Sequence, residues 1–166
     1  MNSKAKQYIK KLKLKKHPEG GYYKEIYRSG EIIIGEHLPK RFKSSRSFST
    51  SIYFLLEGEQ ISAFHLLQSD ELWHFYDGSN VILYVINKNG RLSKKKIGKG
   101  DGCNFQITIE KNNWFAAELE SKKSFALVGC TVSPGFDFED FVMGKRNALV
   151  QRFPKHKSIL ERLTNI

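Results

Sequence analysis

This chain of 166 residues has little of what marks several large classes of protein. It has only two cysteines, Cys103 and Cys130, and their spacing fits no zinc or redox motif, so neither a disulfide scaffold nor a zinc finger is expected. No apolar run approaches the roughly 20 residues that span a bilayer, and residues 1–16 lack the continuous apolar segment of a secretory signal. We therefore expect a reduced, cytoplasmic protein, without a membrane partner, that folds as one domain.

Acidic residues are scarce relative to basic ones, with 17 Asp and Glu against 28 Lys and Arg and a formal net charge of +11. Such a charge suits nucleic acid or an anionic small ligand. However, 21 of the basic residues are lysines, whereas arginine, with its planar guanidinium, forms the better paired hydrogen bonds to bases and phosphates. The chain also contains no helix-turn-helix, zinc-finger or RNA-binding strand motif. A solvated lysine-rich surface is the expectation, and nucleic-acid binding remains a minor alternative.

Short β-type segments, in contrast, are abundant. Apolar and polar residues alternate in runs bounded by Gly, Asp or Asn, at residues 51–58, 61–67, 71–78, 81–90, 91–100, 104–110, 114–119 and 124–132. Many short strands with little helix between them predict an antiparallel sandwich or barrel. Helical periodicity is confined to the ends. We expect a single domain over residues 1–166, with a basic helix in 1–16, the barrel over 17–141 and a helical segment over 142–166.

The segment from Ser62 to Gly78 places chemically active side chains among core-forming residues. His65, Glu71 and His74 can each bind a metal or move a proton, and such groups are costly to bury without a partner. A tight turn brings His65 close to Glu71, whereas alternation points His74 to the opposite face. The first strand of this hairpin is expected to present a shared face made of Ile61, Ala63, His65 and Leu67.

The same residues resemble a known superfamily. His65, Leu67, Glu71 and Gly78 stand at the first histidine, second histidine, glutamate and glycine of the first cupin motif. The segments HPEGGYY, SDELWHF and GCTVSPGFDFEDF closely resemble the cupin-like "domain of unknown function 985" family, and the match runs from about His17 to Thr164. The turn at residues 110–113 lacks the proline and glycine that are usual in the second cupin motif.

This resemblance implies an all-β fold, the cupin-type double-stranded β-helix or jelly roll, with short terminal helices, an interior cavity as the site and usually a homodimer. A typical metal-binding cupin holds Fe, Mn, Ni or Zn with three His and one Glu. Here Leu67 replaces one histidine, and Trp114 and Phe115 stand where another is expected. Two ligands do not hold a divalent metal tightly, because catalytic zinc sites, for example, use three protein ligands, so no cofactor is assigned from the sequence. A divalent metal, if bound, would use His65, Glu71 and His74.

We therefore expect a cupin that binds no metal, or binds one weakly, and acts through its own side chains. His65 and Glu71 are the candidate catalytic acid–base pair, although a buried His–Glu pair can also be purely structural. The candidate ligand-binding residues are His17, Arg28, Arg46, Tyr53, Trp73, His74, Tyr84 and Trp114. Glu19, beside His17, either serves the site or only anchors the turn. Residues 133–141 are expected to form a structural flap or a dimer contact.

The resemblance extends to sugar-nucleotide epimerases, and it implies that the barrel binds a small polar, carbohydrate-like ligand, which the positive charge would allow to be anionic. An epimerase-like or isomerase-like activity follows from that likeness. Two alternatives remain: a non-catalytic cupin that binds a small molecule, and a metal-dependent oxygenase or isomerase.

Overall fold

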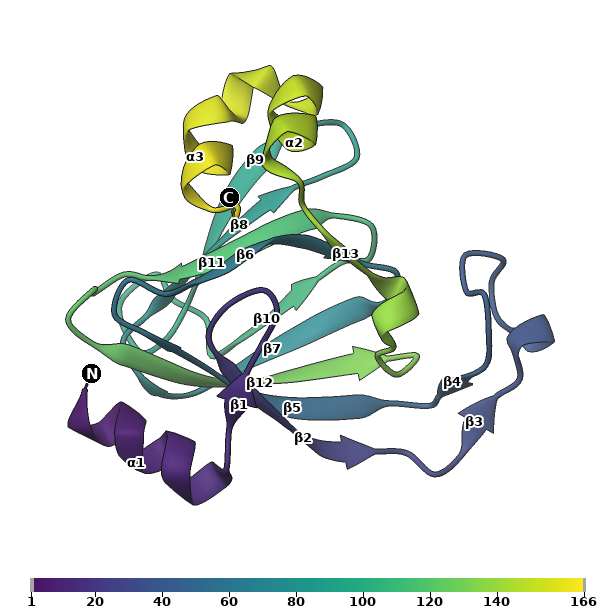
Figure 1. The fold of residues 1–166 in the computed structure, drawn as a ribbon, viewed down its shortest axis with the longest axis horizontal. Coiled ribbons are helices and arrows are strands. Elements are labelled where there is room, and N and C mark those ends of the chain that lie inside the picture. The colour runs from purple at the N-terminus through teal and green to yellow at the C-terminus, as the bar shows by residue number, and fades with distance from the viewer. Residues whose placement is uncertain (1, 166) are drawn as a thin grey trace.

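A computed structural model describes residues 2–165 as a sandwich of two antiparallel β-sheets (Figure 1). The six-stranded sheet has the order β1-β2-β5-β12-β7-β10, formed by Lys15–Lys16, Tyr22–Arg28, Thr50–Glu57, Phe125–Ser133, Asp70–Gly78 and Gln106–Ile109. The five-stranded sheet has the order β13-β6-β11-β8-β9, formed by Phe141–Met143, Ile61–Leu67, Trp114–Leu119, Val81–Ile86 and Leu92–Ile97. The successive strands β5 to β8 alternate between the two sheets, as in a jelly roll. The predicted all-β cupin-type fold is confirmed.

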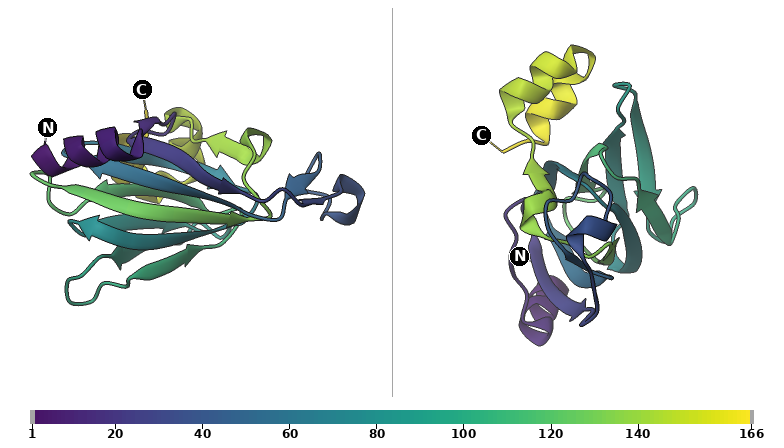
Figure 2. Two further views of the ribbon diagram at one scale, coloured as in Figure 1. Left: turned by 90° about the horizontal axis from the view of Figure 1, so that it is seen from below. Right: turned by 90° about the vertical axis from the view of Figure 1, so that its right-hand side faces the viewer.

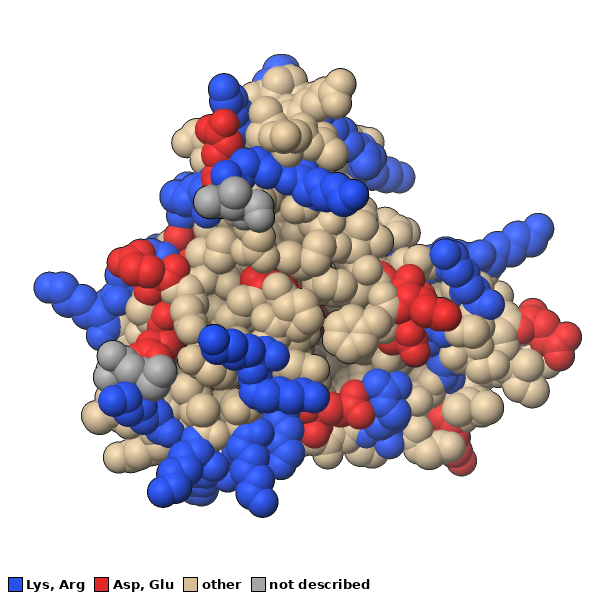
Figure 3. All heavy atoms as spheres, in the orientation of Figure 1, with Lys and Arg blue, Asp and Glu red and all other residues tan. Residues whose placement is uncertain are grey.

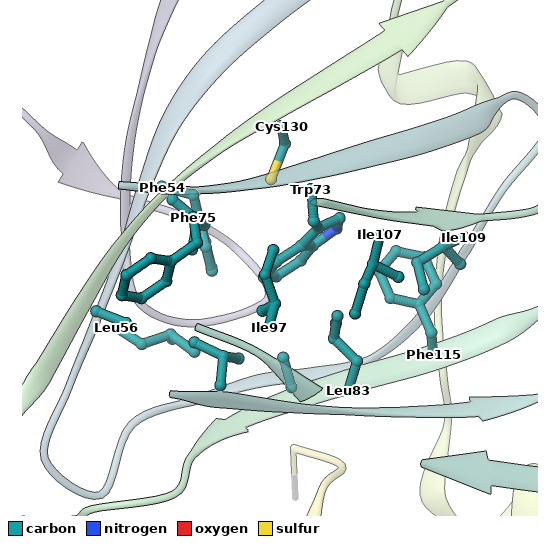
Figure 4. Close-up of a cluster of buried hydrophobic side chains, with 14 of the residues drawn as sticks. Phe54, Leu56, Trp73, Phe75, Leu83, Ile97, Ile107, Ile109, Phe115 and Cys130 are labelled. Atoms are coloured by element: carbon teal, nitrogen blue, oxygen red, sulfur yellow. The ribbon is translucent and has the colours of Figure 1, made fainter. Parts of the chain in front are cut away.

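The main hydrophobic core fills the space between the two sheets. Figure 4 shows Trp73 and Phe54 from the six-stranded sheet facing Leu83 and Phe115 from the other sheet. Trp73 is 1% exposed, and its ring lies 5.8 Å from that of Phe54. Alternation in the sequence places these apolar side chains on inner faces, and their burial provides the main driving force for folding.

Buried and exposed side chains alternate along β7 as the sequence predicts, but they do not alternate regularly along β6. In β7, Glu71, Trp73 and Phe75 are buried, whereas the intervening side chains are half-buried or exposed. In β6, the pairing with β11 shifts register between Phe115 and Ala117. Such a bulge inserts an extra residue, so the side chains on its two sides no longer keep one alternation. As a result Ile61 packs in the outer cluster beneath the C-terminal helices, so the shared face predicted from Ile61 to Leu67 is wrong at its first residue.

The N-terminal helix α1 (Ser3–Leu12) covers the outer face of the six-stranded sheet (Figure 2). The Asn2 side chain caps the helix by accepting hydrogen bonds from the backbone of its first turn. Lys13 adopts a left-handed conformation with φ 54° and ends the helix, so Lys15–Lys16 already pair with β2. Tyr8, Ile9 and Leu12 pack on the sheet, which leaves the lysines of α1 in solvent.

The C-terminal segment covers the outer face of the five-stranded sheet. It contains α2 (Arg146–Arg152), a 3₁₀ turn η3 (Pro154–His156) and α3 (Lys157–Arg162). Their apolar side chains form a second cluster with Phe64 and Tyr84 of the sheet. None of the helices in residues 2–165 combines the length and the apolar character needed to cross a bilayer.

The remaining segment, between β2 and β5, projects from the barrel as an arm (Figure 1). It contains β3 (Ile32–Ile33), a 3₁₀ turn η1 (Gly35–His37) and β4 (Arg46–Ser47), with β3 paired to β4. Basic side chains lie over several parts of the surface, and Figure 3 shows many of them over α1 and β1 and others on the arm.

Candidate functional site

A cavity of about 380 Å³ lies at the end of the sandwich where β6 ends and β7 begins. Four buried side chains, called the polar cluster below, line it: His17, Glu19, His65 and Glu71. Three phenylalanines, called the aromatic wall, line another side: Phe136, Phe138 and Phe141. Lys15, Lys24 and Arg28 also line the cavity, from β1 and β2. The cavity therefore combines apolar walls with a few convergent polar groups, which is the usual make-up of a small-molecule site.

The HPEGG turn at residues 17–21 delivers two members of the polar cluster. Its two glycines have positive φ values of 112° and 69°, a conformation that glycine adopts at little cost. A Cβ atom at Gly20 would lie only 2.1 Å from the backbone oxygen of Ile61. The turn can therefore lie flat on β6, where the Ala63 N–H donates to the Glu19 carbonyl at 2.8 Å. This contact fixes the direction of the Glu19 side chain.

Glu19 is the centre of the polar cluster. Its Oε1 accepts a hydrogen bond from the Ser62 hydroxyl at 2.8 Å. Its Oε2 lies 3.3 Å from His65 Nε2 and 3.5 Å from His17 Nδ1. Burial raises the pKa of the Glu19 carboxyl, and His17 and Ser62 offset only part of that rise.

His65 lies deep in the cavity with 2% of its surface exposed. Its Nδ1 is 2.8 Å from the Ala63 carbonyl oxygen, so Nδ1 carries the proton and donates. Its ring lies 4.0 Å from the Phe115 ring and 5.3 Å from the Phe141 ring, which fixes the imidazole plane. Burial lowers the pKa of His65, and the nearby Glu71 carboxylate opposes that shift.

Glu71 is the second buried carboxyl of the cluster. Its Oε2 accepts a hydrogen bond from the Trp73 indole N–H at 2.9 Å. Burial raises the pKa of Glu71 to about 7, with His65 lowering it and Glu19 raising it further. Glu71 and His65 therefore shift each other's pKa, as expected for two groups that the hairpin brings close together. The carboxylate within ion-pair distance of His65, however, is Glu19.

The aromatic wall is held in place by two arginines predicted to bind ligand. Arg46 is buried and donates to both carboxylate oxygens of Asp140, at 2.6 and 2.8 Å. Arg28 donates to the Phe136 carbonyl at 3.1 Å and pairs with Glu25. Arg28 lines the cavity, whereas Arg46 is committed to the ion pair behind the wall. The segment expected to be a flap thus supplies one side of the cavity.

Four other candidate residues lie away from the cavity. His74 is on the outer face of β7, where it pairs with Gly129 and Gln106 in the sheet. Tyr53 packs on the outer face beneath α1. Tyr84 and Trp114 pack in the cluster beneath the C-terminal helices. The structure therefore separates these four side chains from the polar cluster, whereas Trp73 contacts it through Glu71.

Glu19 is the member of the polar cluster that the sequence indicates least clearly. It stood beside His17 in a turn whose glycines pointed equally to a purely structural role. Its partner Ser62 lies 43 residues further along the chain. The sequence feature that could have identified Glu19 is the presence of an acidic residue in the turn, since a turn needs no glutamate beside its two glycines.

The residues present do not fit the metal site of a typical cupin. Within residues 2–165, no group of three or more His, Cys, Asp or Glu side chains is arranged to hold a metal ion. Leu67 stands in the cavity lining where a ligand would be needed, and His74 points to the other face of its sheet. What these residues can do is exchange protons, because the cluster contains two carboxyls and two imidazoles in contrasting environments.

Comparisons with known proteins agree with this fold. The family described as Cupin superfamily (DUF985) matches residues 6–144. A crystal structure of a protein from Shewanella oneidensis is 35% identical, with a TM-score of 0.87, and the match covers 99% of this chain and 98% of that one. A hypothetical protein from Leishmania major is 30% identical, with a TM-score of 0.87 and coverage of 98% and 99%. No curated protein matches the chain.

A more distant likeness exists to oxalate decarboxylase from Bacillus subtilis. A variant of that enzyme is 15% identical with a TM-score of 0.54, and the match covers 89% of this chain and 36% of that one. At this identity the likeness concerns the fold alone. The family match and the two full-length relatives lead to one conclusion: this chain belongs to the cupin superfamily, in its DUF985 family.

Proposed function

We propose that this cupin binds a small polar, carbohydrate-like molecule in its cavity and catalyses the movement of a proton on it, as an epimerase or isomerase does. The observation that carries the proposal is the pair of buried groups His65 and Glu71, which line a cavity of about 380 Å³. A volume of this size suits a small ligand. A Glu71 pKa of about 7 suits a group that gains and loses a proton near neutral pH.

The reaction class follows from these groups. Abstraction of a hydrogen next to a carbonyl group needs a base, and return of a proton to the other face or to the neighbouring carbon gives the epimer or isomer. Glu71 is the base in this scheme, and the buried environment strengthens it by disfavouring its charged form. Lys15, Lys24 and Arg28 line the cavity beside the acidic residues Glu25 and Asp137, and a lysine there can pair with an anionic substituent on the ligand.

The test is hydrogen exchange with solvent. Wild-type protein is incubated in D₂O with ketose phosphates, aldose phosphates and sugar nucleotides, and deuterium incorporation is followed by NMR. We expect incorporation at the carbon next to the carbonyl of at least one compound, and a loss of about 10²–10⁴-fold in Glu71→Gln. His74→Gln, on the outer face of the same strand, is the matched control and should exchange as wild type does.

The non-catalytic alternative predicts a different result. A binding module would be stabilised by one of these compounds, by about 2.7 kcal/mol at a hundredfold excess over Kd, with no deuterium incorporation. A thermal-shift assay on the same panel measures this. Stabilisation without exchange, for all compounds tested, would replace the proposed enzyme by a binding protein.

We also propose that the protein is a cytoplasmic homodimer. Support comes from large apolar side chains exposed on β2 and on the projecting arm, namely Ile26, Tyr27, Ile32, Ile34 and Phe48. Ile32 is 59% exposed, and an apolar surface of this kind favours association. Light scattering after gel filtration should give twice the 19.2 kDa chain mass. Ile32→Glu should give the monomer; a monomeric wild type would refute the dimer.

A further inference from the structure

Three hydrogen-bonding groups around the Glu19 carboxyl determine where its proton is. Ser62 Oγ donates to Oε1 at 2.8 Å, so Oε1 acts as an acceptor. The other oxygen, Oε2, faces the two ring nitrogens of His65 and His17 at 3.3 and 3.5 Å. All of these side chains are buried, so each hydrogen-bonding position needs a partner of the opposite kind.

His17 offers Glu19 an acceptor. The backbone N–H of Glu19 donates to His17 Nδ1 at 3.3 Å, so Nδ1 has a lone pair and no proton. His17 is therefore the neutral tautomer with its proton on Nε2. The same Nδ1 lone pair lies 3.5 Å from Glu19 Oε2. A carboxylate oxygen there would place two lone pairs against each other.

His65 offers a second acceptor from the other side. Its Nδ1 donates to the Ala63 carbonyl at 2.8 Å, so the neutral ring has its lone pair on Nε2. That Nε2 is the atom 3.3 Å from Glu19 Oε2. Oε2 thus faces two unprotonated ring nitrogens, and a proton on Oε2 that is donated to His65 Nε2 satisfies this arrangement without creating a buried charge.

We propose that Glu19 is a neutral carboxylic acid whose Oε2 hydroxyl donates to His65 Nε2, and that Glu19 is the catalytic acid of the cavity. The catalytic part of this proposal rests on the proposed function, whereas the protonation part stands on the hydrogen-bond pattern alone. Burial supports the assignment from both sides, since it raises the pKa of Glu19 and lowers the pKa of His65 and His17.

The chemistry then has an acid and a base on two different carboxyls. The Glu71 carboxylate takes the hydrogen next to the carbonyl as a proton, and the C–H electron pair becomes the C=C bond of an enol. The Glu19 O–H bond breaks as its proton passes to the carbonyl oxygen, and Glu19 becomes a carboxylate beside His65. Isomerisation follows when Glu71 returns its proton to the former carbonyl carbon and Glu19 takes the hydroxyl proton from the neighbouring carbon, whose oxygen becomes the new carbonyl. Both carboxyls are then restored, with no oxidant or reductant required.

Glu19→Gln provides a sharp test because glutamine copies the neutral acid. Its amide oxygen can accept from Ser62, and one of its N–H groups can donate to His65 Nε2. The variant keeps the hydrogen-bond pattern and loses only the transferable proton. Glu161→Gln on α3, with the Glu161 side chain 49% exposed, is the matched control.

The first measurement is the protonation of each imidazole nitrogen, from long-range ¹H–¹⁵N NMR spectra of ¹⁵N-labelled protein at neutral pH. We expect His65 protonated only at Nδ1 and His17 only at Nε2, in wild type and Glu19→Gln alike. An ionised Glu19 would instead require a proton on both nitrogens of His65 in wild type and a neutral ring in the variant. That change, or one tightly bound metal per chain that replaces the proton, would overturn the proposal.

The second measurement is deuterium exchange into the sugar that wild type processes. We expect Glu19→Gln to lose about 10²–10⁴-fold in rate and Glu161→Gln to lose nothing. Exchange at the wild-type rate in Glu19→Gln would overturn the catalytic role of Glu19 and leave the proposed function standing. Absence of exchange in wild type itself would overturn the proposed function, and the catalytic role of Glu19 with it.

Discussion

The ion pair behind the aromatic wall is the clearest place to test how the cavity is held. Arg46 and Asp140 expose only 1% and 4% of their side chains. The guanidinium donates through Nε and Nη2 to the two carboxylate oxygens, and Nη1 also donates to the Ser44 and Ser45 carbonyls at 3.0 and 2.8 Å. Arg46→Ala removes all of these bonds and leaves a buried carboxylate without its cation.

The expected loss is large because the remaining charge is desolvated. Breaking a buried pair by removing one partner costs about 3–5 kcal/mol. For a chain of this length each kcal/mol lowers Tm by about 2–4 °C, so Arg46→Ala should lower Tm by about 6–20 °C. Urea unfolding followed by tryptophan fluorescence gives the free energy of unfolding directly. Arg46→Ala/Asp140→Ala should lose less than the sum of the single variants, since no unpaired charge remains.

The matched control is Arg28, whose pair with Glu25 is exposed by 42% and 40%. Arg28→Ala should lose no more than about 1 kcal/mol, because exposed pairs are screened by solvent. If Arg46→Ala also lost less than about 1 kcal/mol, the argument that a buried pair anchors the aromatic wall would be refuted.

The other predictions concern Glu71, Gly20 and Tyr84. Burial raises the folded-state pKa of Glu71 from 4.5 to about 7, so the free energy of unfolding of wild type falls as pH rises through this window. Relative to wild type, Glu71→Gln should therefore gain up to about 3 kcal/mol between pH 5 and pH 8, measured by urea unfolding. Gly20→Ala should cost about 1–3 kcal/mol or more, because φ is +112° and the new Cβ meets the Ile61 oxygen at 2.1 Å. Tyr84→Phe should cost about 1–3 kcal/mol in unfolding experiments, because Tyr84 donates to the buried Glu118 at 2.8 Å, and should leave ligand binding unchanged.

Each of these has an outcome that would contradict it. A constant difference between Glu71→Gln and wild type across the pH range would show that the carboxyl titrates as it does in the unfolded chain. Gly102→Ala, which has a φ of 71° and open space around it, separates backbone strain from collision; an equal loss there would exclude the collision at Gly20. A weaker thermal shift in Tyr84→Phe would place Tyr84 in the site after all.

Local pattern was enough to predict the strands, because each inner face of a sandwich imposes a two-residue period. β7 shows this best, since Glu71 and Trp73 are buried and His74 is on the opposite face, as alternation predicts. β6 shows the limit. Its register shift against β11 depends on the partner strand and cannot be read from the residues of β6 alone. The prediction that Ile61 lies on the same face as His65 is therefore wrong.

The site divides in the same way. The sequence by itself determined the fold, the family and the proximity of His65 to Glu71 in one hairpin, because these depend on spacing along the chain. Only the tertiary structure decided that Glu19 completes the site, since the HPEGG turn reaches it by packing against β6. It also moved Tyr84 and Arg46 out of the cavity lining and into supporting ion-pair and hydrogen-bond networks. The physical reason is that a buried polar group needs a partner, and the partner comes from whichever segment folds against it.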